Sequence, residues 1–572
     1  MSRRERLAVA AVVLLAAGLR FAFPDRMAIE HFDEGVYASN IFFGPEEGNR
    51  YPYRHLYAPP LLPWLIEWLI VFLGPEGIAP FLPALVLGTA TVPLAWWAAR
   101  CWFGPAAGLA AGLLVATSDF HLLYSRTALT DAPVAFFLLL AVYLYWEAVR
   151  RRSLAWSAAA GLATGLAWWT KYTGWLPLAI AASGSVAWVL FERRAGGISP
   201  LTRAKTVATC FAVMAVTAFA VWSPVLWGLQ DYGGYTAVAE NHRGYLQPYS
   251  NWPENLVRQA ANLAAQSGGP TTVGIAFIVC ALPLASRWPL PVRLLLAFWC
   301  AGTTAWVVFA LGPAFTLAVL ALAGLTVELL GSIRPDAGDD RNAVERRFAA
   351  WLVAAWFVGM FVTMPLYYPY PRLAMPWLLA AILGVTGWAV PTTANTAARH
   401  FNRRDLFAAV LLVLPMAMIV ERFPRGGVLT AGVEVPGWQD RTGLRDASFR
   451  IADDLQTARR RDLPTVLYVY GDPATFYHLA TAVSDRNTAI LPAGDQSFVY
   501  DPPAGVETFV VYGSATIFGD GRERDRPVIG AGRLRNVTHQ SFAASEFLLA
   551  DRPDGLTTAM SIPLHLYRVV SR

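Results

Sequence analysis

The feature that most constrains this chain is its series of apolar windows, many of them long enough to cross a lipid bilayer. Apolar residues make up 55% of the 572 residues and charged residues only 15%, against about 25% charged in a typical soluble domain. A membrane-spanning helix needs roughly 20 mostly apolar residues. The sequence therefore predicts an all-α polytopic membrane domain with about 13 transmembrane helices. We place the spans at residues 7–23, 79–99, 105–123, 132–149, 154–170, 174–191, 206–227, 271–286, 292–310, 313–331, 348–366, 373–391 and 405–421.

Basic residues bunch at intervals along the chain and predict its orientation. Cytoplasmic loops of membrane proteins are enriched in Lys and Arg, so each pair of bunches should enclose an even number of spans. This puts the N-terminus in the cytoplasm and everything after about residue 422 outside. We attribute the net charge of +6 to these loops and not to nucleic-acid binding. The bunches are Arg3/Arg4/Arg6, Arg150/Arg151/Arg152, Arg193/Arg194 with Arg203/Lys205, Arg287/Arg293, Arg341/Arg346/Arg347 and Arg399/Arg403/Arg404.

One apolar run, residues 59–74, does not fit the series of spans. It is short and carries Glu67, and runs of this length are more often re-entrant or interfacial. Were it a span, every later loop would change sides and Arg150–Arg152 would lie outside. We therefore expect a helix lying on the outer face, within a long first outer loop at about residues 24–78.

The tail, residues 422–572, has a more polar composition and predicts a small extracytoplasmic α/β domain. Residues 465–471, 507–513 and 564–570 are typical of strands, and residues 475–483 of a short helix. The tail has no glycine-rich phosphate loop and no cluster of metal ligands, so the sequence assigns it no chemistry. The four cysteines all lie in or beside apolar runs, which argues against structural disulfides and zinc sites.

Ionisable side chains gather in the loops predicted to lie outside. Asp33 and Glu34 follow the first span in the stretch "EHFDEGVYASN", and Asp131 begins the fourth span. Because a charge at mid-bilayer costs at least about 2.5–3.5 kcal/mol, these groups are expected to line a water-accessible cavity at the outer edge. A carboxylate there can act as a general base, and a cation can hold a phosphate. The cations on this side are Arg126, Lys171, Arg243 and Arg372.

Each of these residues also has a simpler interpretation. Asp33 and Glu34 could merely sit in water, and Asp131 could be the N-cap of its helix, since "TDAP" places a proline in the first turn. Lys171 could extend from a helix end to the interface, and Arg372 could be an interfacial cation. Glu30 and His31 are expected to be bystanders.

The order of the motifs is more specific than any single residue. "FDEGVYA", "YAPPLLPW", "YSRTALTDAPVAFFLLL", "GLATGLAWWTKYTGWLPL" and "YYPYPRLAMPWLLAAI" follow one another. This order resembles the GT-C membrane glycosyltransferases over roughly residues 5–390, and most of all the branch of protein O-mannosyltransferases and lipid A aminoarabinose transferases. The resemblance implies transfer of a hexosyl or pentosyl group from a polyprenyl-phosphate donor to an acceptor hydroxyl. It further implies inversion at the anomeric carbon, a non-cytoplasmic active site and, in a bacterium, the cytoplasmic (inner) membrane of the cell envelope.

The resemblance also implies roles for individual residues. Asp33 would be the general base, Glu34 would shape the site, and Asp131 would be the second acidic residue of the pocket. The donor phosphate would be held by Lys171 and Arg372, with Arg126 and Arg243 as further candidates. The substrate pocket would include Tyr37, Tyr57 and Tyr370.

The sequence departs from the family in its first loop. Aminoarabinose transferases often carry an acid and a lysine before the first-loop proline, where this chain has Tyr57 and Ala58. The acceptor is therefore left open between a lipid, a glycan and a protein. No cofactor is predicted, and a divalent metal is left open, because His31, Asp33, Glu34 and His55 could supply ligands but match no set pattern.

Two other functions are compatible with a polytopic chain. A transporter or flippase would place ionisable groups or broken helices near mid-bilayer, often in two repeated halves, whereas here the charges lie at one edge and no repeat is evident. A non-catalytic scaffold would use the α/β tail to bind a partner.

Overall fold

A computed structural model describes residues 1–43, 54–192, 199–265, 341–389, 436–483, 485–493, 505–512, 532–545, 547–548 and 561–571. The chain forms two compact units. The helical unit consists of Met1–Ala22, Ala84–Arg126 and Thr130–Gly437. The loop–sheet unit consists of Phe23–Pro83, Thr127–Leu129 and Trp438–Arg572.

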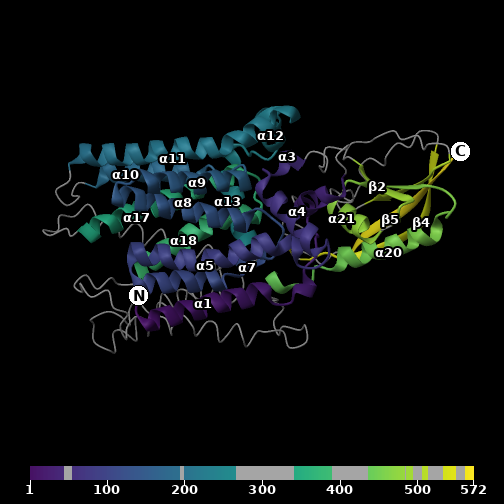
Figure 1. The fold of residues 1–572 in the computed structure, drawn as a ribbon, viewed down its shortest axis with the longest axis horizontal. Coiled ribbons are helices and arrows are strands. Elements are labelled where there is room, and N and C mark those ends of the chain that lie inside the picture. Colours follow the sequence, from purple (N-terminus) through teal and green to yellow (C-terminus); the bar gives the residue numbers. More distant parts are fainter. Residues whose placement is uncertain are drawn as a thin grey trace. The chain divides into compact units, whose positions relative to one another are not determined.

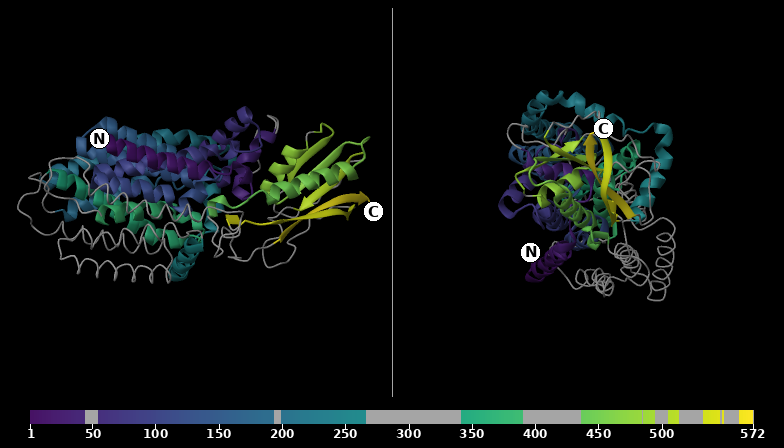
Figure 2. Two further views of the ribbon diagram at one scale, coloured as in Figure 1. Left: turned by 90° about the horizontal axis from the view of Figure 1, so that it is seen from below. Right: turned by 90° about the vertical axis from the view of Figure 1, so that its right-hand side faces the viewer.

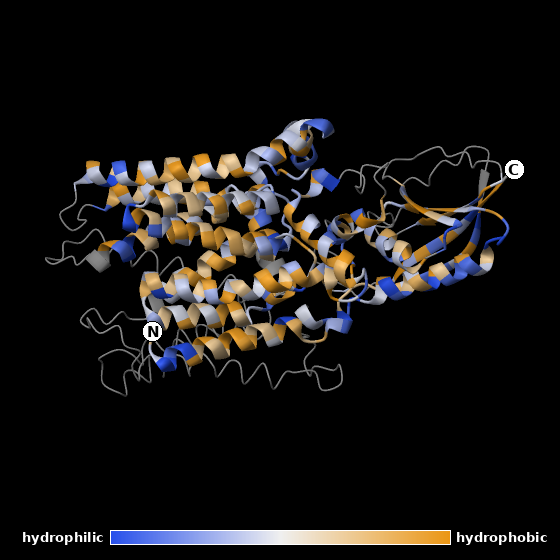
Figure 3. Ribbon diagram, viewed as in Figure 1, coloured by the Kyte–Doolittle hydropathy of each residue, from blue (hydrophilic) through white to orange (hydrophobic). Residues whose placement is uncertain are grey.

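The helical unit is a bundle of apolar helices that run side by side (Figure 1). Within it α8 packs on α9, α9 on α11, and α10 on α17. Its helices are hydrophobic along most of their length (Figure 3), as expected of helices surrounded by lipid and by one another. Its elements are α1 (Arg3–Phe21), α5 (Leu82–Phe103), α6 (Pro105–Thr117), α7 (Asp119–Ser125), α8 (Asp131–Arg151), α9 (Leu154–Thr170), α10 (Leu176–Phe191), α11 (Pro200–Gly228), α12 (Gly234–Arg243), α13 (Trp252–Ala265), α17 (Arg341–Thr363) and α18 (Met375–Ala389).

The mostly helical class is confirmed, but the count of 13 spans is not. Among the described residues four helical segments are long and apolar enough to cross a membrane: Ala79–Phe103, Asp131–Arg151, Pro200–Gly228 and Val344–Leu366. A fifth is formed if α6 and α7, bent by 60° at their junction, are one broken span. The predicted spans at residues 271–286, 292–310, 313–331 and 405–421 lie outside the described residues.

Basic residues from several of the predicted cytoplasmic bunches form ion pairs at helix ends. Glu147, near the end of α8, pairs with Arg150 at 2.6 Å and with Arg151 at 2.6 Å. Arg347 in α17 pairs with Glu192, just after α10, at 3.1 Å. The Glu147 pairs lie within the last turns of α8, the Arg347–Glu192 pair links α17 to the end of α10, and Arg150 also lies 3.9 Å from Glu345 of α17. These are helix ends at which the sequence places cytoplasmic loops.

A further ion pair bears on the run at residues 59–74. Arg100 near the end of α5 pairs with Glu5 near the start of α1, so these two helix ends lie together. A chain that leaves one end of the bundle in α1 and returns to it in α5 has crossed twice. This supports the prediction that the intervening run is not a complete span. That run forms α4 (Leu61–Leu73), which at 1.5 Å per residue is shorter than a bilayer core of about 30 Å.

The loop–sheet unit joins the first predicted outer loop to the tail. Its five strands form one mixed sheet of order β2-β1-β3-β5-β4, with β1 parallel to β2 and β3, and β5 antiparallel to β3 and β4. Helix α20 lies along this sheet (Figure 2, left) and buries Leu444, Ala447, Ile451 and Leu455 at helical spacing. The elements are α2 (Phe32–Ala38), α3 (Arg54–Tyr57), α4, α20 (Gly443–Ala458), α21 (Pro473–Ala482), β1 (Thr465–Tyr470), β2 (Thr488–Ala493), β3 (Glu507–Tyr512), β4 (Gly532–Ala543) and β5 (Ser561–Ser571).

The predicted elements of the tail are confirmed. The strands expected at 465–471, 507–513 and 564–570 are β1, β3 and β5, and the helix expected at 475–483 is α21. The sequence missed β2, β4 and α20. The domain boundary expected near residue 421 falls outside the described residues and stays a prediction.

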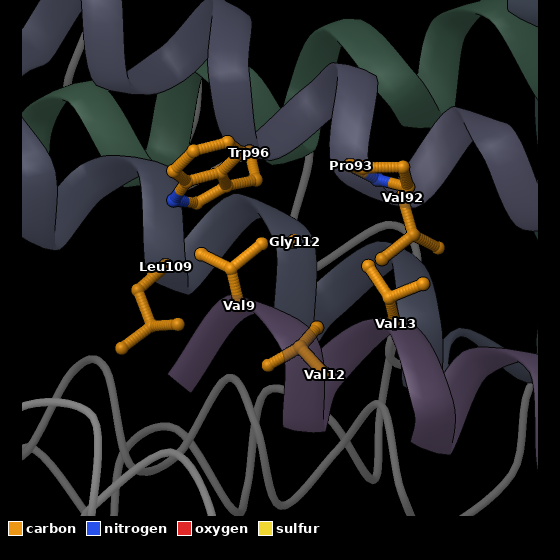
Figure 4. A pocket seen from close by; sticks show the side chains of 8 residues that line it. All are labelled: Val9, Val12, Val13, Val92, Pro93, Trp96, Leu109 and Gly112. Carbon is orange, nitrogen blue, oxygen red and sulfur yellow. The ribbon is translucent and has the colours of Figure 1, made fainter. Parts of the chain in front are cut away.

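A small hollow lies within the helical unit where α1, α5 and α6 meet (Figure 4). It is lined by apolar side chains such as Val12, Val92 and Leu109, with Trp96 beside them. None of the described residues that line it is charged.

Candidate functional site

The acidic cluster of the first loop forms the beginning of α2. His31 is the N-cap, and its ring Nδ1 accepts a hydrogen bond from the backbone N–H of Asp33 at 3.0 Å. Glu34, three residues later, folds back so that its Oε2 accepts from the backbone N–H groups of Glu30 and His31, both at 3.0 Å. This reciprocal arrangement is a capping box, which satisfies backbone donors that a helix start would otherwise leave open.

Glu34 is completely buried, and its carboxylate holds separate parts of the loop–sheet unit together. Besides the two capping bonds, Oε1 accepts from the backbone N–H of Ala128 at 2.9 Å. Oε2 also lies 2.5 Å from Nη2 of Arg441, which comes from the tail. Burial alone would raise the pKa of Glu34. The Arg441 guanidinium and the hydrogen bonds outweigh burial, so the pKa of Glu34 lies below its usual value.

Glu30 is also buried and faces the same arginine. Its Oε2 lies 3.7 Å from Nε of Arg441, and its carboxylate accepts hydrogen bonds from the backbone N–H of Ser545, at 2.9 Å, and from the Ser545 hydroxyl. Here burial prevails over Arg441 and Ser545, and the pKa of Glu30 is raised. No local sequence pattern could predict this contact, since Glu30 and Ser545 are 515 positions apart.

Asp33 differs from its neighbour in exposure. It lies in the first turn of α2, directly before Glu34, but its side chain is only half-buried. Of the adjacent pair, Asp33 is therefore the carboxylate more accessible to a substrate. Tyr37 is buried in the same helix and donates a 3.5 Å hydrogen bond to the backbone oxygen of Tyr57. Their predicted place in a substrate pocket stays a prediction.

Asp131 and Lys171 meet in the helical unit, at the start of α8 and the end of α9. Nζ of Lys171 lies 2.5 Å from Oδ1 of Asp131, with the side chains 20% and 2% exposed. Oδ2 of Asp131 is buried and has no hydrogen-bond partner among the described residues. The N-cap of α8 is Thr130 and not Asp131, so the interpretation of Asp131 as a cap was wrong: its carboxylate instead pairs with a cation from the next helix.

Aromatic rings connect the end of α9 with the loop that carries Arg372. Tyr172, next to Lys171, contacts the ring of His242 in α12 at 5.9 Å, and His242 contacts Tyr245 at 6.5 Å. Tyr245 in turn contacts Tyr370 at 6.0 Å, and the guanidinium of Arg372 lies over that ring, 5.2 Å from its centroid.

Backbone hydrogen bonds fix the loop of Arg372 in place. The N–H of Tyr368 donates to the backbone oxygen of Tyr245 at 2.8 Å. The side-chain amide of Gln259, in α13, donates to the backbone oxygens of Tyr370 at 2.9 Å and Pro371 at 3.2 Å. Because prolines hold the residues before them extended and donate no N–H, such external donors are what order a "YPYPR" segment. Arg243, at the end of α12, is exposed.

Arg126 has a different environment from the other predicted cations. It is 1% exposed, and its Nη1 donates to the backbone oxygens of Arg20 at 2.6 Å and Ala22 at 2.5 Å. These carbonyls end α1, where a helix leaves acceptors open and favours a positive charge. The contacts favour a role in holding the end of α1, and we leave Arg126 out of the proposed site.

The four side chains considered as metal ligands do not form a site in the structure. Among the described residues no group of three His, Cys, Asp or Glu could hold a metal ion. Nδ1 of His31 accepts the Asp33 N–H, and the carboxylate of Glu34 is taken up by Arg441 and backbone donors. We assign no metal to this cluster.

Comparisons with known proteins agree with the resemblance noted in the sequence. The sequence model of the family described as "Dolichyl-phosphate-mannose-protein mannosyltransferase" matches residues 57–227. A putative mannosyltransferase of Bacillus subtilis (strain 168), YkcB, is 33% identical over 98 residues, which cover 17% of this chain and 14% of that relative. The chain thus spans a small part of that relative. The predicted resemblance to GT-C membrane glycosyltransferases is confirmed by the family match, and the apolar helices show an integral membrane protein.

Two solved structures are similar to the chain, with low sequence identities and low TM-scores. The archaeal oligosaccharyltransferase AglB from Archaeoglobus fulgidus, in complex with an inhibitory peptide and a dolichol-phosphate, is 14% identical with a TM-score of 0.46 over 89% of this chain and 69% of its own. ArnT from Cupriavidus metallidurans, bound to undecaprenyl phosphate, is 15% identical with a TM-score of 0.44 over 98% of this chain and 97% of its own.

Proposed function

We propose that this protein transfers a sugar from a polyprenyl-phosphate donor to an acceptor hydroxyl. The observation that carries the proposal is the largely buried ion pair of Lys171 and Asp131, inside the segment that matches the mannosyltransferase family. A cation at the end of a span is suited to a phosphate, and the Asp131 carboxylate fixes the position of that cation.

The chemistry follows from the carboxylates and cations. Asp33 takes the proton of the acceptor hydroxyl as that oxygen attacks the anomeric carbon. The bond between that carbon and the phosphate oxygen breaks, and its electron pair leaves with the lipid phosphate. Lys171 and Arg372 stabilise the charge on the leaving phosphate, so it needs no proton. Attack from the side opposite the phosphate inverts the anomeric carbon.

The half-buried state of Asp33 supports its choice as the base over Glu34. A general base must come within hydrogen-bond reach of the proton that it takes. Glu34 is 0% exposed, and its oxygens already accept from three backbone N–H groups and Arg441. Glu34 therefore shapes the site by holding α2, and Asp33 meets the acceptor.

The active site faces the outside of the membrane in this proposal, with the N-terminus in the cytoplasm. The ion pairs at the ends of α8, α10 and α17 support this orientation, since they gather basic residues of predicted cytoplasmic loops. The family description, which names a dolichyl-phosphate-mannose donor, supports a polyprenyl-phosphate mannose as the first donor to try. The acceptor stays open between a lipid, a glycan and a protein.

The test is sugar transfer by the full-length protein in liposomes that contain a radiolabelled polyprenyl-phosphate mannose and envelope extract as acceptor. Asp33→Asn should lower kcat by about 10²–10⁴-fold, the usual contribution of a general base, without lowering the amount of folded protein. Asp25→Asn, an exposed acid in the same loop, is the matched control and should keep full activity. Full activity of Asp33→Asn would refute the mechanism, and counterflow of the donor without a covalent product would favour a flippase instead.

A further inference from the structure

We infer that Arg441, in the C-terminal segment, is a positioning residue for glycosyl transfer: it fixes α2 and thereby sets the place of Asp33. The inference rests on the proposed function for the role of Asp33, and goes beyond it by giving the tail a task in the reaction.

Arg441 is held tightly and from several sides within the loop–sheet unit. Its side chain is 4% exposed, and Nη2 lies 2.5 Å from Oε2 of Glu34. Its backbone N–H donates to the backbone oxygen of Arg26 at 2.9 Å. The guanidinium also lies over two aromatic rings, 4.7 Å from the centroid of Phe547 and 5.8 Å from that of Phe81. A planar, permanently charged group with these neighbours has one well-defined orientation.

Glu34 transmits that orientation to the start of α2. The carboxylate that meets Arg441 also accepts the N–H groups of Glu30 and His31, and it reaches Ala128 with its other oxygen. Helix α2 has only seven residues, too few to be stable without external contacts. Because Asp33 is in the same first turn, the direction of its side chain depends on these contacts of Glu34 with Arg441 and the backbone, which we call the clamp on α2.

Other residues of the tail contact α2 and the residues around it. Nε2 of His478 lies 2.7 Å from the backbone oxygen of Ile29. The hydroxyl of Ser39 donates to the backbone oxygen of Pro473 at 3.3 Å. A Cβ at Gly35 would come within 2.3 Å of the backbone nitrogen of Ala474, so α2 and α21 touch backbone to backbone. These contacts tie the tail to the helix that carries Asp33.

The experiment uses the full-length protein with Arg441→Gln, Arg441→Lys and the control Arg445→Gln. Arg445 is in α20, only a few residues further along the chain, and its side chain is 35% exposed. Two quantities are measured: kcat and KM for donor and acceptor, and hydrogen exchange of the α2 amides by mass spectrometry. Loss of a charged hydrogen bond should lower kcat about ten- to hundredfold, with both KM values within about threefold.

The variants are expected to form a series. In Arg441→Gln the amides of Glu30 and His31 should exchange at least about tenfold faster, whereas amides of β1 should not change. Arg441→Lys keeps the charge without the planar fork, so its kcat and exchange rates should fall between Arg441→Gln and the wild type. Arg445→Gln should match the wild type. If Arg441→Gln gives too little folded protein, the same comparison is made with Arg441→Lys.

Two results would overturn the inference. One is unchanged α2 exchange in both Arg441 variants, with activity lost only in proportion to folded protein; the other is an equal effect of Arg445→Gln. A wild type that transfers no sugar from any polyprenyl-phosphate donor refutes the proposed function alone. In that case the exchange measurement by itself decides whether Arg441 positions α2.

Discussion

Removing the Lys171 ammonium should destabilise the protein much more than removing the whole ion pair with Asp131. The two charges are 2.5 Å apart, and the side chain of Asp131 is only 2% exposed. In Lys171→Met that carboxylate stays buried with no donor to either oxygen among the described residues. Breaking one partner of a buried pair costs about 3–5 kcal/mol. Because Lys171 is 20% exposed, we expect about 2–4 kcal/mol here.

The double variant Asp131→Asn/Lys171→Met removes both charges, so no uncompensated charge remains. Its stability should lie within about 1 kcal/mol of the wild type, because replacing a complete buried pair is often neutral. The double variant should nevertheless be unable to transfer sugar, because Lys171 is proposed to hold the donor phosphate. Stability and activity would then separate in one protein.

The assay is equilibrium unfolding in mild detergent with increasing SDS, followed by tryptophan fluorescence. Arg258→Gln is the matched control: its partner Glu254 lies 2.7 Å away, but the two side chains are 56% and 63% exposed. An exposed helix pair of this kind should contribute no more than about 0.5 kcal/mol. The reasoning is refuted if Lys171→Met costs as little as the control, or if the double variant is destabilised by the sum of the two single changes.

Three further changes test other parts of the structure. Burial lowers the pKa of His478 to about 4, while the unfolded chain takes up this proton near pH 6.5. The free energy of unfolding should therefore fall as the pH drops from about 6.5 to 4, by on the order of 3 kcal/mol at 1.36 kcal/mol per pKa unit. His478→Gln should flatten the dependence of stability on pH over this range. Gly35→Ala places a Cβ against the backbone of Ala474 and should lower the free energy of unfolding by about 1–3 kcal/mol. The control Gly18→Ala, whose added Cβ would meet nothing within 4 Å, should not destabilise the protein. Thermal melts of the two variants compare their stabilities. Arg126→Gln should lower stability by about 1–3 kcal/mol and leave the donor KM unchanged in the transfer assay.

The long apolar helices of the described residues and the inner strands could be predicted because each has a local pattern, whereas the amphipathic α20 was missed. The apolar run of α8, for instance, is long enough to identify a span, and β1 and β3 are runs of buried β-branched and aromatic residues. The two missed strands, β2 and β4, are the edges of the sheet. Edge strands are more exposed. The apolar run of β2 is short and is followed by Pro492, and β4 is mostly polar, so neither has the long apolar run of an inner strand.

The candidate site could be predicted only in its acidic and cationic members. Asp33, Glu34, Asp131 and Lys171 were found because charges next to apolar spans are costly without a function. Arg441 was not, because 407 positions separate it from Glu34 and its surroundings in the sequence are ordinary for a polar tail. Such a pairing exists only in the folded chain, and no local periodicity could signal it.

The two buried carboxylates around Arg441 explain how the clamp on α2 can withstand mild acid. Burial raises the pKa of Glu30, whereas Arg441 and the backbone N–H groups of Glu30 and His31 keep the pKa of Glu34 below its usual value. As the pH falls, Glu30 therefore takes up a proton first, which removes a buried charge and favours the folded state. The stabilisation from Glu34 is present above the pKa of the unfolded side chain and is lost only as the pH falls through its lower folded value. The ion pair of Glu34 and Arg441 that orients Asp33 thus outlasts the protonation of Glu30.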